Sequence, residues 1–393
     1  MSAEDLASAV VDLTVALVGI DSVSPSLVPG SAGEHELASY LAERLSSAGF
    51  AVRLVEAAAD PRRVSLIATR TGSRPGRTVV LNGHLDTVGV EGMPQPFTAR
   101  IESGRLYGRG ATDMKGGVAG LVVAAERLAA ADAPGTVIVA LVADEEDASV
   151  GAEAVLDDLR ARGVSMDLCL IAEPTWLDLA VAHRGYAVID VRFSGKAAHS
   201  SQPGEGVDAI RALGKLLSAV EDSDASLRAR PAHPLLSFGS LMATVVRGGS
   251  ATFSVAATAD VSVERRTLPG ESSAAALDEV RALVDPIVAA TPGLASTLTL
   301  THAREPWQVD GSGRAAEFSA LLSSALSATG SSAPDRVGAP YWMESALWQA
   351  AGIPTVVCGP AGGGLHAVDE WVDLEQLQCF PAAVADEIGR AHV

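Results

Sequence analysis

The chain has 393 residues, and its 29 Lys and Arg residues against 48 Asp and Glu residues give a net charge of −19. This length suffices for two domains, and the 48% hydrophobic and 20% charged content is that of an ordinary globular protein. The negative charge argues against binding to nucleic acid or to anionic membrane surfaces, and no run of 18 apolar residues predicts a membrane span.

The sequence also favours a cytoplasmic location. Its three cysteines, Cys169, Cys358 and Cys379, lie far apart and do not suggest a disulfide framework, so a reducing compartment is expected. The first ten residues lack the basic start and the apolar core of a signal peptide.

The spacing of apolar residues predicts alternating helices and strands up to about residue 175. Leu6, Val10, Leu13 and Leu17 repeat at the period of a helix, and a second helix is expected to end at Gly49. We then expect strands at 51–55, 64–68, 78–81, 136–143 and 168–172, and helices at 117–131 and 151–162. This alternation predicts an α/β fold with a mostly parallel central sheet flanked by helices.

The pattern changes near residue 180. Strands at 179–193, 252–263 and 296–301 alternate with helices at 208–220 and 274–289, which predicts a smaller α+β domain. The α/β character then returns, with helices at 315–328, 344–351 and 374–388 and a strand at 355–358. We therefore predict one domain built from residues 1–180 and 300–393, with an inserted domain at 181–299.

Acidic and histidine side chains follow the ends of four predicted strands. In chain order they are His84 and Asp86, Glu145 and Glu146, Glu173, and His366. Asp113 stands before a predicted helix, where a negative charge is favourable. Because ligands bind beyond the carboxyl ends of the strands in open α/β sheets, we expect these side chains to converge on one edge.

Each of these residues has an ordinary alternative when it is taken alone. The acids can be solvated loop residues, Asp113 can be a helix cap, and His366 can simply follow a glycine-rich turn. The coincidence of five such positions at strand ends or a helix start favours a metal site.

The ligand types indicate which metals fit. Histidine nitrogen mixed with carboxylate oxygen suits zinc, and also cobalt or manganese. Two histidines with three or four acids suit two metals, and a pair about 3.5–4 Å apart serves hydrolysis through a shared carboxylate. Such a pair polarises a carbonyl and acidifies a shared water, whose proton a further carboxylate must accept. Glu145 and Glu146 are adjacent, so one can bind metal while the other acts as the base.

At these positions the sequence resembles a known family. The matching segments are NGHLDTV at 82–88, GRGATDMKGG at 108–117, ADEED at 143–147, AEPT at 172–175, GKAAHSSQP at 195–203 and GPAGGGLHAVDEWV at 359–372. They are similar to the dizinc metallopeptidases that include acetylornithine deacetylase, succinyl-diaminopimelate desuccinylase, aminoacylase and glutamate carboxypeptidase. The resemblance covers nearly the whole chain, in the family's order.

The resemblance implies a ligand set for two divalent metal ions, most simply zinc. Asp113 is expected to bridge the two metals. His84 and Glu173 are expected to hold one metal, and Glu146 and His366 the other.

The resemblance also implies roles for four further residues. Asp86 is expected to orient the His84 ring, and Glu145 is expected to be the general base. The inserted domain is expected to act as a lid and to form a homodimer, with His199 reaching the partner's active site to stabilise an oxyanion. Arg266 is expected to bind the substrate carboxylate, although a solvated strand-end charge is the alternative.

The expected function is hydrolysis of the amide bond of an N-acyl amino acid, as in acetylornithine deacetylase. The alternatives are a glutamate-carboxypeptidase-like or dipeptidase exopeptidase with the same metal centre, which would cleave a short peptide, and a noncatalytic amino-acid or peptide binder. A Gly-x-Ser-x-Gly elbow is absent from the sequence, so a serine α/β hydrolase is excluded.

Three positions depart from the family pattern. Phe253 and Ala256 stand where many relatives carry Asn and Pro, which puts the usual lid contacts with substrate in doubt. Glu344 stands where relatives often have Asp. It either meets a cationic substrate group or is only an acid at a helix start, and we favour the second interpretation.

Overall fold

The computed structural model describes residues 2–309, 311–329 and 333–391, which form two compact units. The larger unit comprises Met1–Val181, Val309–Val337 and Met343–Val393, and the smaller comprises Ala182–Gln308 and Gly338–Trp342. The smaller unit is thus inserted into the larger. The first segment of the smaller unit ends at Gln308 and not at the predicted residue 299, because its last long strand continues to Arg304.

A mixed sheet forms the centre of the larger unit. Seven strands follow one another across it in the order β1 (Ala51–Ala57), β2 (Asp60–Thr71), β6 (Thr136–Val142), β3 (Thr78–His84), β7 (Leu168–Ile171), β17 (Thr355–Val357) and β8 (Leu179–His183). The middle strands β6, β3, β7 and β17 pair in parallel, and β1, β2 and β8 pair antiparallel with their neighbours. Parallel strands are covered on both faces, which explains why their sequences are nearly continuous apolar runs.

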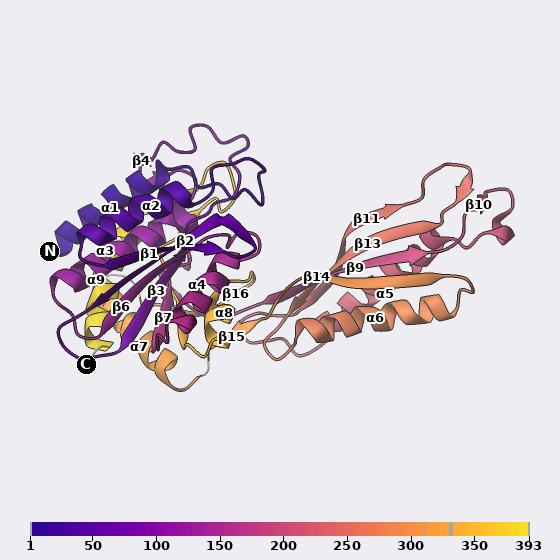
Figure 1. Cartoon of the computed structure of the whole chain (residues 1–393). Coiled ribbons are helices and arrows are strands. Elements are labelled where there is room, and N and C mark those ends of the chain that lie inside the picture. The colour runs from indigo at the N-terminus through magenta and orange to yellow at the C-terminus, as the bar shows by residue number, and fades with distance from the viewer. Residues whose placement is uncertain (1, 310, 330–332, 392–393) are drawn as a thin grey trace. The chain divides into compact units, whose positions relative to one another are not determined.

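Helices cover this sheet on both sides (Figure 1). They are α1 (Ala3–Val18), α2 (His35–Ser47), α3 (Gly116–Ala130), α4 (Val150–Ala161), α7 (Arg314–Ala328), α8 (Ser345–Ala350) and α9 (Leu374–Ala391). The predicted apolar face of α1 is buried, and Ser2 and Asp5 form a capping box at its start. The short strand β16 (Arg336–Ala339) pairs with β8.

Two glycines let α3 approach its neighbours closely. A Cβ atom on Gly117 would lie 2.2 Å from the carbonyl oxygen of Ala172, and one on Gly120 would lie 2.5 Å from the ring of Phe380 in α9. Because both positions exclude a side chain, the helix that follows Asp113 is held against the loop that leads to Glu173.

A small antiparallel sheet also belongs to the larger unit. Its strands are β18 (Gly362–Gly363), β19 (Trp371–Asp373), β5 (Arg105–Tyr107) and β4 (Arg100–Glu102), in that order. It connects the segment around Gly108 with the loop that carries His366.

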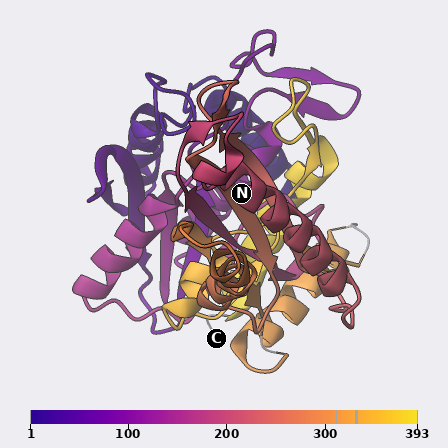
Figure 2. The same ribbon diagram turned by 90° about the vertical axis from the view of Figure 1, so that its right-hand side faces the viewer.

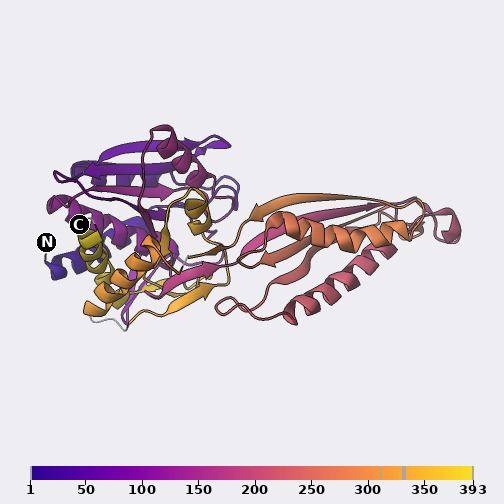
Figure 3. The same ribbon diagram turned by 90° about the horizontal axis from the view of Figure 1, so that it is seen from below.

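The smaller unit is an antiparallel sheet covered by two helices. The sheet order is β11 (Ser240–Gly248), β13 (Thr258–Thr267), β9 (Gly185–Ser194) and β14 (Ala295–Arg304). The helices α5 (Ala209–Arg228) and α6 (Ser273–Ala289) pack against it, as Figures 2 and 3 show within this unit. The short elements are β10 (Ala198–His199), which pairs with β12 (Ser254–Val255), the 3₁₀ turn Pro203–Glu205, and β15 (Trp307–Gln308), which pairs with the last residues of β8.

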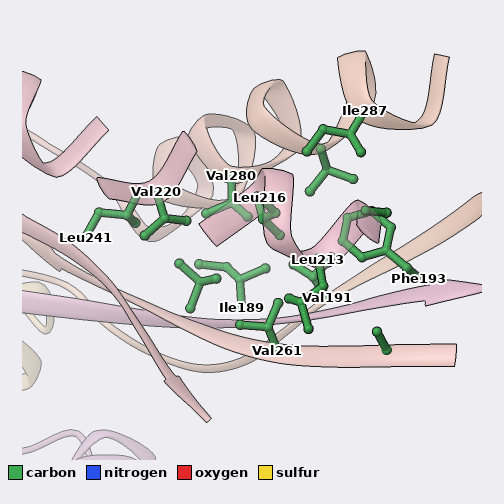
Figure 4. Close-up of a cluster of buried hydrophobic side chains, with 14 of the residues drawn as sticks. Ile189, Val191, Phe193, Leu213, Leu216, Val220, Leu241, Val261, Val280 and Ile287 are labelled. Carbon is green, nitrogen blue, oxygen red and sulfur yellow. The ribbon is translucent and has the colours of Figure 1, made fainter. Parts of the chain in front are cut away.

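The smaller unit has its own hydrophobic core, shown in Figure 4. Alternate residues of β9, among them Ile189, Val191 and Phe193, point toward Leu213 and Leu216 of α5. This alternation of buried and exposed side chains is typical of a sheet with one covered face.

One strand prediction in the insertion was wrong, and one strand was not predicted. The segment 179–193 forms two strands, because β8 pairs within the larger sheet whereas β9, after Arg184, pairs with β13 and β14. The edge strand β11 was missed because most of its residues are exposed, so its sequence lacks the alternation that marks a half-buried strand.

Replacing Phe193 with Ala should destabilise the smaller unit. The ring is fully buried, and the cavity left by such a truncation costs about 3–5 kcal/mol. Hydrogen exchange of peptides from β9 and α5 measures this loss. Phe253→Ala is the matched control, because Phe253 is 72% exposed and its truncation should change stability by less than about 0.5 kcal/mol. Equal effects of the two variants would contradict the described core.

Candidate metal centre

His84 is the last residue of the buried strand β3, so the sheet fixes its position. Its Nδ1 lies 2.9 Å from the backbone carbonyl oxygen of Asp86, and its Nε2 lies 3.0 Å from Oδ1 of Asp113. When Nδ1 donates to the carbonyl, Nε2 carries the lone pair and points toward Asp113. This is the tautomer that a metal ligand needs.

The Asp86 carboxylate does not orient the ring as predicted. It lies 3.7 Å from Nδ1 of His84, which is longer than a hydrogen bond, and the backbone carbonyl of Asp86 takes that place. Its two oxygens instead accept the backbone N–H groups of Glu145 at 3.0 Å and Glu146 at 3.2 Å. Asp86 therefore holds the peptide that carries the two predicted catalytic glutamates.

Asp113 lies on a tight turn, Ala111–Lys115, that follows left-handed Gly110. The buried carboxylate of Glu370 accepts the N–H groups of Gly110, Thr112 and Asp113 at 2.8–3.1 Å. Arg109 donates to the same carboxylate at 2.7 Å. Because one carboxylate accepts three backbone N–H groups of this turn, it fixes the position of Asp113.

Glu173 follows β7 and is 5% exposed. Its Oε1 lies 4.0 Å from Nε2 of His84. The preceding Ala172 donates its N–H to Asn82 in β3 at 3.1 Å, and Thr175 donates its N–H to Gly359 at 3.2 Å. The loop is thus tied to both neighbouring strand ends.

His366 is held on a loop, in left-handed backbone conformation, with its side chain half exposed. Its Nε2 lies 3.4 Å from Oδ2 of Asp113 and 3.1 Å from Oε2 of Glu146. Asp113 therefore faces His84 with one oxygen and His366 with the other. This is the arrangement that a bridging carboxylate requires.

The larger unit thus brings the five predicted metal ligands together with Glu145. Two groups have ligand atoms within 4.8 Å of one another: His84, Glu145 and Glu173, and His84, Asp113 and Glu146. Glu145 belongs to the first group, so its carboxylate lies beside the proposed centre, as a general base must.

The charges of the site shift its pKa values. Burial, together with the charge of Asp113, raises the pKa of Glu146 to about 7, and burial raises that of Glu173 to about 8. Burial favours the neutral ring of His84, but the hydrogen bond to Asp113 and the charge of Glu173 raise its pKa well above the usual value. Hydrogen bonds to Asp113 and Glu146 raise the pKa of His366 to about 10. The shifts reflect several carboxylates crowded together in a buried site, where a bound cation would favour their charged form.

The residues present fit two divalent metal ions. Oε1 of Glu146 is buried and has no hydrogen-bond partner among the described residues, so it is a donor available for coordination. The set of two imidazoles and three carboxylates, one of them shared, supplies the nitrogen and oxygen ligands that such ions take.

His199 and Arg266 belong to the smaller unit, and each is described there by itself. His199 is exposed in β10, and its Nδ1 lies 2.7 Å from Oγ of Ser201. Arg266, at the end of β13, pairs with Glu264 at 2.5 Å, and its guanidinium lies 5.3 Å from the ring centre of Tyr186.

Glu344 precedes α8, but its side chain does not cap that helix. It is buried, and its charge is among the causes that raise the pKa of Glu145. The interpretation as only an acid at a helix start therefore misses its electrostatic effect on the site. Ala256 is buried, and its carbonyl accepts the N–H of Ala209, whereas Phe253 extends into solvent.

The sequence analysis missed the residues that hold the ligands in place. Glu370 had a signal, because it stands four residues after His366 in the glycine-rich segment. Arg109 had a weaker one, within the turn before Asp113. No sequence pattern pointed to Arg63, because it lies in β2, outside every motif.

Among the described residues, none of the helices combines the length and apolar character that crossing a membrane requires.

Comparison with known proteins places the chain in a family. The model of peptidase family M20/M25/M40 matches residues 80–386. The succinyl-diaminopimelate desuccinylase of Stenotrophomonas maltophilia is 30% identical over 392 residues, which cover 95% of this chain and 96% of that protein. The chain therefore belongs to peptidase family M20/M25/M40, and the class that the fold and site define is that of metal-dependent hydrolases of amide bonds.

Other relatives differ in how much they share. The desuccinylase of Acidovorax ebreus is 42% identical over 165 residues, 38% of this chain, and that match spans only 41% of the relative. The acetylornithine deacetylase of Proteus mirabilis is 27% identical over 380 residues, 94% of this chain and 93% of the relative.

Solved structures share the fold at low identity. The aminopeptidase PepT of Bacillus cereus has a TM-score of 0.78 at 19% identity and covers 98% of both chains. The YXEP protein of Bacillus subtilis, described as a dinuclear metal binding peptidase from the M20 family, has a TM-score of 0.74 at 18% identity and covers 99% of both chains.

Replacing Asp113 with Asn should weaken binding of both metals, because its two oxygens face both histidines. We expect affinity for Co²⁺ or Zn²⁺ to fall at least about 10–100-fold, measured by calorimetry on chelator-treated protein and by metal analysis after dialysis. Asp132→Asn, on the surface beside Ser73, is the control. Two metals bound with unchanged affinity in the Asp113 variant would rule out its bridging position.

Proposed function

We propose that the protein is a two-metal deacylase that cleaves the amide bond of an N-acyl amino acid with a free carboxylate. The observation that carries this proposal is the shared carboxylate of Asp113 between His84 and His366, with Glu145 beside it. The full-length similarity to a desuccinylase and a deacetylase supports it.

The metal ligands proposed are those of the sequence analysis. His84 and Glu173 hold one ion, Glu146 and His366 hold the other, and Asp113 binds both. We propose zinc, since the mixed nitrogen and oxygen set suits it, with cobalt or manganese as substitutes. When bound, the ions polarise the amide carbonyl and lower the pKa of the attacking water.

Glu145 is proposed as the general base. Burial and the charge of Glu173 raise its pKa well above that of an ordinary glutamate. A carboxylate beside the centre can accept a proton from the attacking water and return it to the leaving nitrogen. The Asp86 carboxylate, which accepts the N–H of Glu145, keeps the base at this position.

Two acyl groups are the leading candidates. Acetyl is proposed from the glycine-rich segment before His366, which resembles acetylornithine deacetylase. Succinyl is favoured by the identity to desuccinylases, 30% over nearly the full chain and 42% over part of it. A peptidase remains the alternative reaction, and the retention of five ligands and Glu145 speaks against a noncatalytic binder.

A substrate screen tests the proposal. Zinc- or cobalt-loaded protein is assayed against N-acetyl amino acids, N-succinyl amino acids and dipeptides. We expect release of acetate or succinate at a higher kcat/KM than cleavage of any dipeptide. Dipeptide cleavage alone would establish the exopeptidase alternative. Binding without turnover of any class would establish the noncatalytic one.

Replacing Glu145 with Gln should leave metal binding intact and lower kcat by about 10²–10⁴-fold, because the proton acceptor is lost. Steady-state kinetics and metal analysis on the same sample measure this. Glu153→Gln, exposed on α4, is the control. A near-normal kcat in the Glu145 variant would remove it as the base.

A homodimer through the smaller unit is part of the proposal. The strand β11 is at an edge of its sheet and exposes Met242, Val245 and Val246, with Ile210 of α5 also exposed. An edge strand with exposed apolar side chains favours pairing with another chain. Phe253 adds a further exposed ring in this unit.

His199 is proposed to act in the partner's site, where it stabilises the oxyanion. Mixing His199→Ala subunits with Glu145→Ala subunits should then restore part of the activity, because a mixed dimer contains one intact site. Native mass spectrometry confirms the mixed dimers, and a coupled assay measures turnover. No recovery in confirmed mixed dimers would show that His199 does not act across the interface.

Arg266 is proposed to bind the substrate carboxylate. Its guanidinium is only partly buried, and Glu264 is paired with its Nε, so its two terminal nitrogens can meet a ligand carboxylate. Arg266→Ala should raise KM for free-acid substrates more than for their amides. An unchanged ratio between acid and amide would discard this role.

A cytoplasmic location is proposed with the same function. None of the three cysteines, all of which the structure describes, forms a disulfide, and Cys169 and Cys358 are buried, which fits a reducing compartment.

A further inference from the structure

We propose that Arg63, in β2, is a positioning residue that fixes the Glu145–Glu146 peptide of the metal centre through Asp86 and Asp144. The inference rests on the proposed function, because Glu145 is its base and Glu146 one of its ligands. It assigns a role in the reaction to a residue that lies outside every sequence motif.

Arg63 is 1% exposed and faces three carboxylates. Its Nη2 lies 2.7 Å from Oε1 of Glu34, 2.7 Å from Oδ1 of Asp144 and 3.5 Å from Oδ2 of Asp86. Its two terminal nitrogens also donate to Oγ of Ser24 at 3.1–3.2 Å. A buried guanidinium with this many acidic neighbours is held in a single position.

Two of those carboxylates are linked to the catalytic peptide. Asp86 accepts the N–H groups of Glu145 and Glu146, one on each oxygen. Asp144 directly precedes Glu145 in the chain and has left-handed backbone with φ 68°. Arg63 therefore contacts both Asp144, which precedes this peptide, and Asp86, which accepts its N–H groups.

Asp144 is itself fixed at both oxygens. Its Oδ1 accepts the hydroxyl of Ser26 at 3.1 Å, and its Oδ2 lies 3.4 Å from the N–H of Val150 at the start of α4. Left-handed backbone is costly for aspartate, so surrounding contacts must hold it. Of these contacts, the one to Arg63 is an ion pair with a positively charged group, whereas Ser26 and the N–H of Val150 are neutral donors.

The geometry favours a guanidinium. Nη2 lies within ion-pair distance of Glu34, Asp144 and Asp86, and Nη1 adds a second donor to Ser24, so two nitrogens of one rigid planar group are held at once, whereas the ammonium of lysine is a single point charge on a flexible stem. A lysine at this position keeps the charge but loses the simultaneous contacts. The direction of the Glu145 and Glu146 side chains then becomes less defined, although the fold retains a compensating cation.

Arg63→Lys is therefore the decisive variant, and Arg63→Met removes the charge as well. We expect Arg63→Lys to fold and to show a kcat about 10–100-fold lower, with little change in KM. We also expect weaker binding of Co²⁺ and an altered absorption spectrum of the bound Co²⁺, because Glu146 is displaced. Arg63→Met is expected to lose more in each measurement, with lysine giving partial rescue.

Arg62→Lys is the matched control. Arg62 is the preceding residue in the same strand, but its side chain is exposed and pairs with Asp60 on the surface. The same substitution there should leave kcat, metal affinity and the Co²⁺ spectrum unchanged. Thermal unfolding of each variant separates loss of stability from loss of positioning.

The outcomes decide between three cases. Wild-type kcat, metal affinity and Co²⁺ spectrum in Arg63→Lys overturn the inference, whatever Arg63→Met does. A lowered melting temperature with an unchanged Co²⁺ spectrum and kcat also overturns it, because Arg63 is then only structural. If the wild-type protein hydrolyses no amide but Arg63→Lys alters the Co²⁺ spectrum, the proposed function fails and the positioning role stands.

Discussion

The two oxygens of Asp113 face two different imidazoles, at 3.0 Å and 3.4 Å, and the rest of the metal centre depends on this shared contact. Glu146 and Glu173 also lie beside the His84 ring. Their carboxylates and that of Asp113 are therefore crowded together and repel one another, and burial strengthens this repulsion. Positive charge must therefore compensate this repulsion, and two divalent ions would do so. The constraint explains why so many acids occur on one edge of an otherwise apolar sheet.

Each proposed ligand follows a strand or lies on a tight turn. Two buried arginine–carboxylate pairs fix the backbone of the segments that carry these ligands. Glu370, paired with Arg109, binds the turn of Asp113, and Asp86, beside Arg63, binds the peptide of Glu145 and Glu146. In both groups a carboxylate accepts backbone N–H groups, so it fixes main chain rather than one side chain. This preorganises the ligands before any metal or substrate binds.

The smaller unit contributes by a different physical route. The residues of its core, which come mainly from β9, β13, α5 and α6, all lie within this unit. His199 and most residues of β11 are exposed and Arg266 is partly buried, and these are the residues proposed for association and substrate contact. Under the proposed function, the larger unit carries the chemistry and the smaller unit contributes to binding of substrate and partner.

The sequence by itself indicated the residues of the proposed centre and the character of the larger fold. Apolar runs that lead to His84, Glu146 and Glu173 predict buried parallel strands with these side chains just beyond or at their ends. This prediction is possible because periodicity and residue type are local properties. Tertiary structure decided which groups meet behind them. Arg63 lies 23 residues before Asp86 and 81 before Asp144, and only the pairing of β2 with β6 and of β6 with β3 brings these residues together. It also decided that the Asp86 carboxylate binds the N–H groups of Glu145 and Glu146 while its backbone carbonyl faces the His84 ring. Contacts between distant segments depend on packing geometry, which no local pattern encodes.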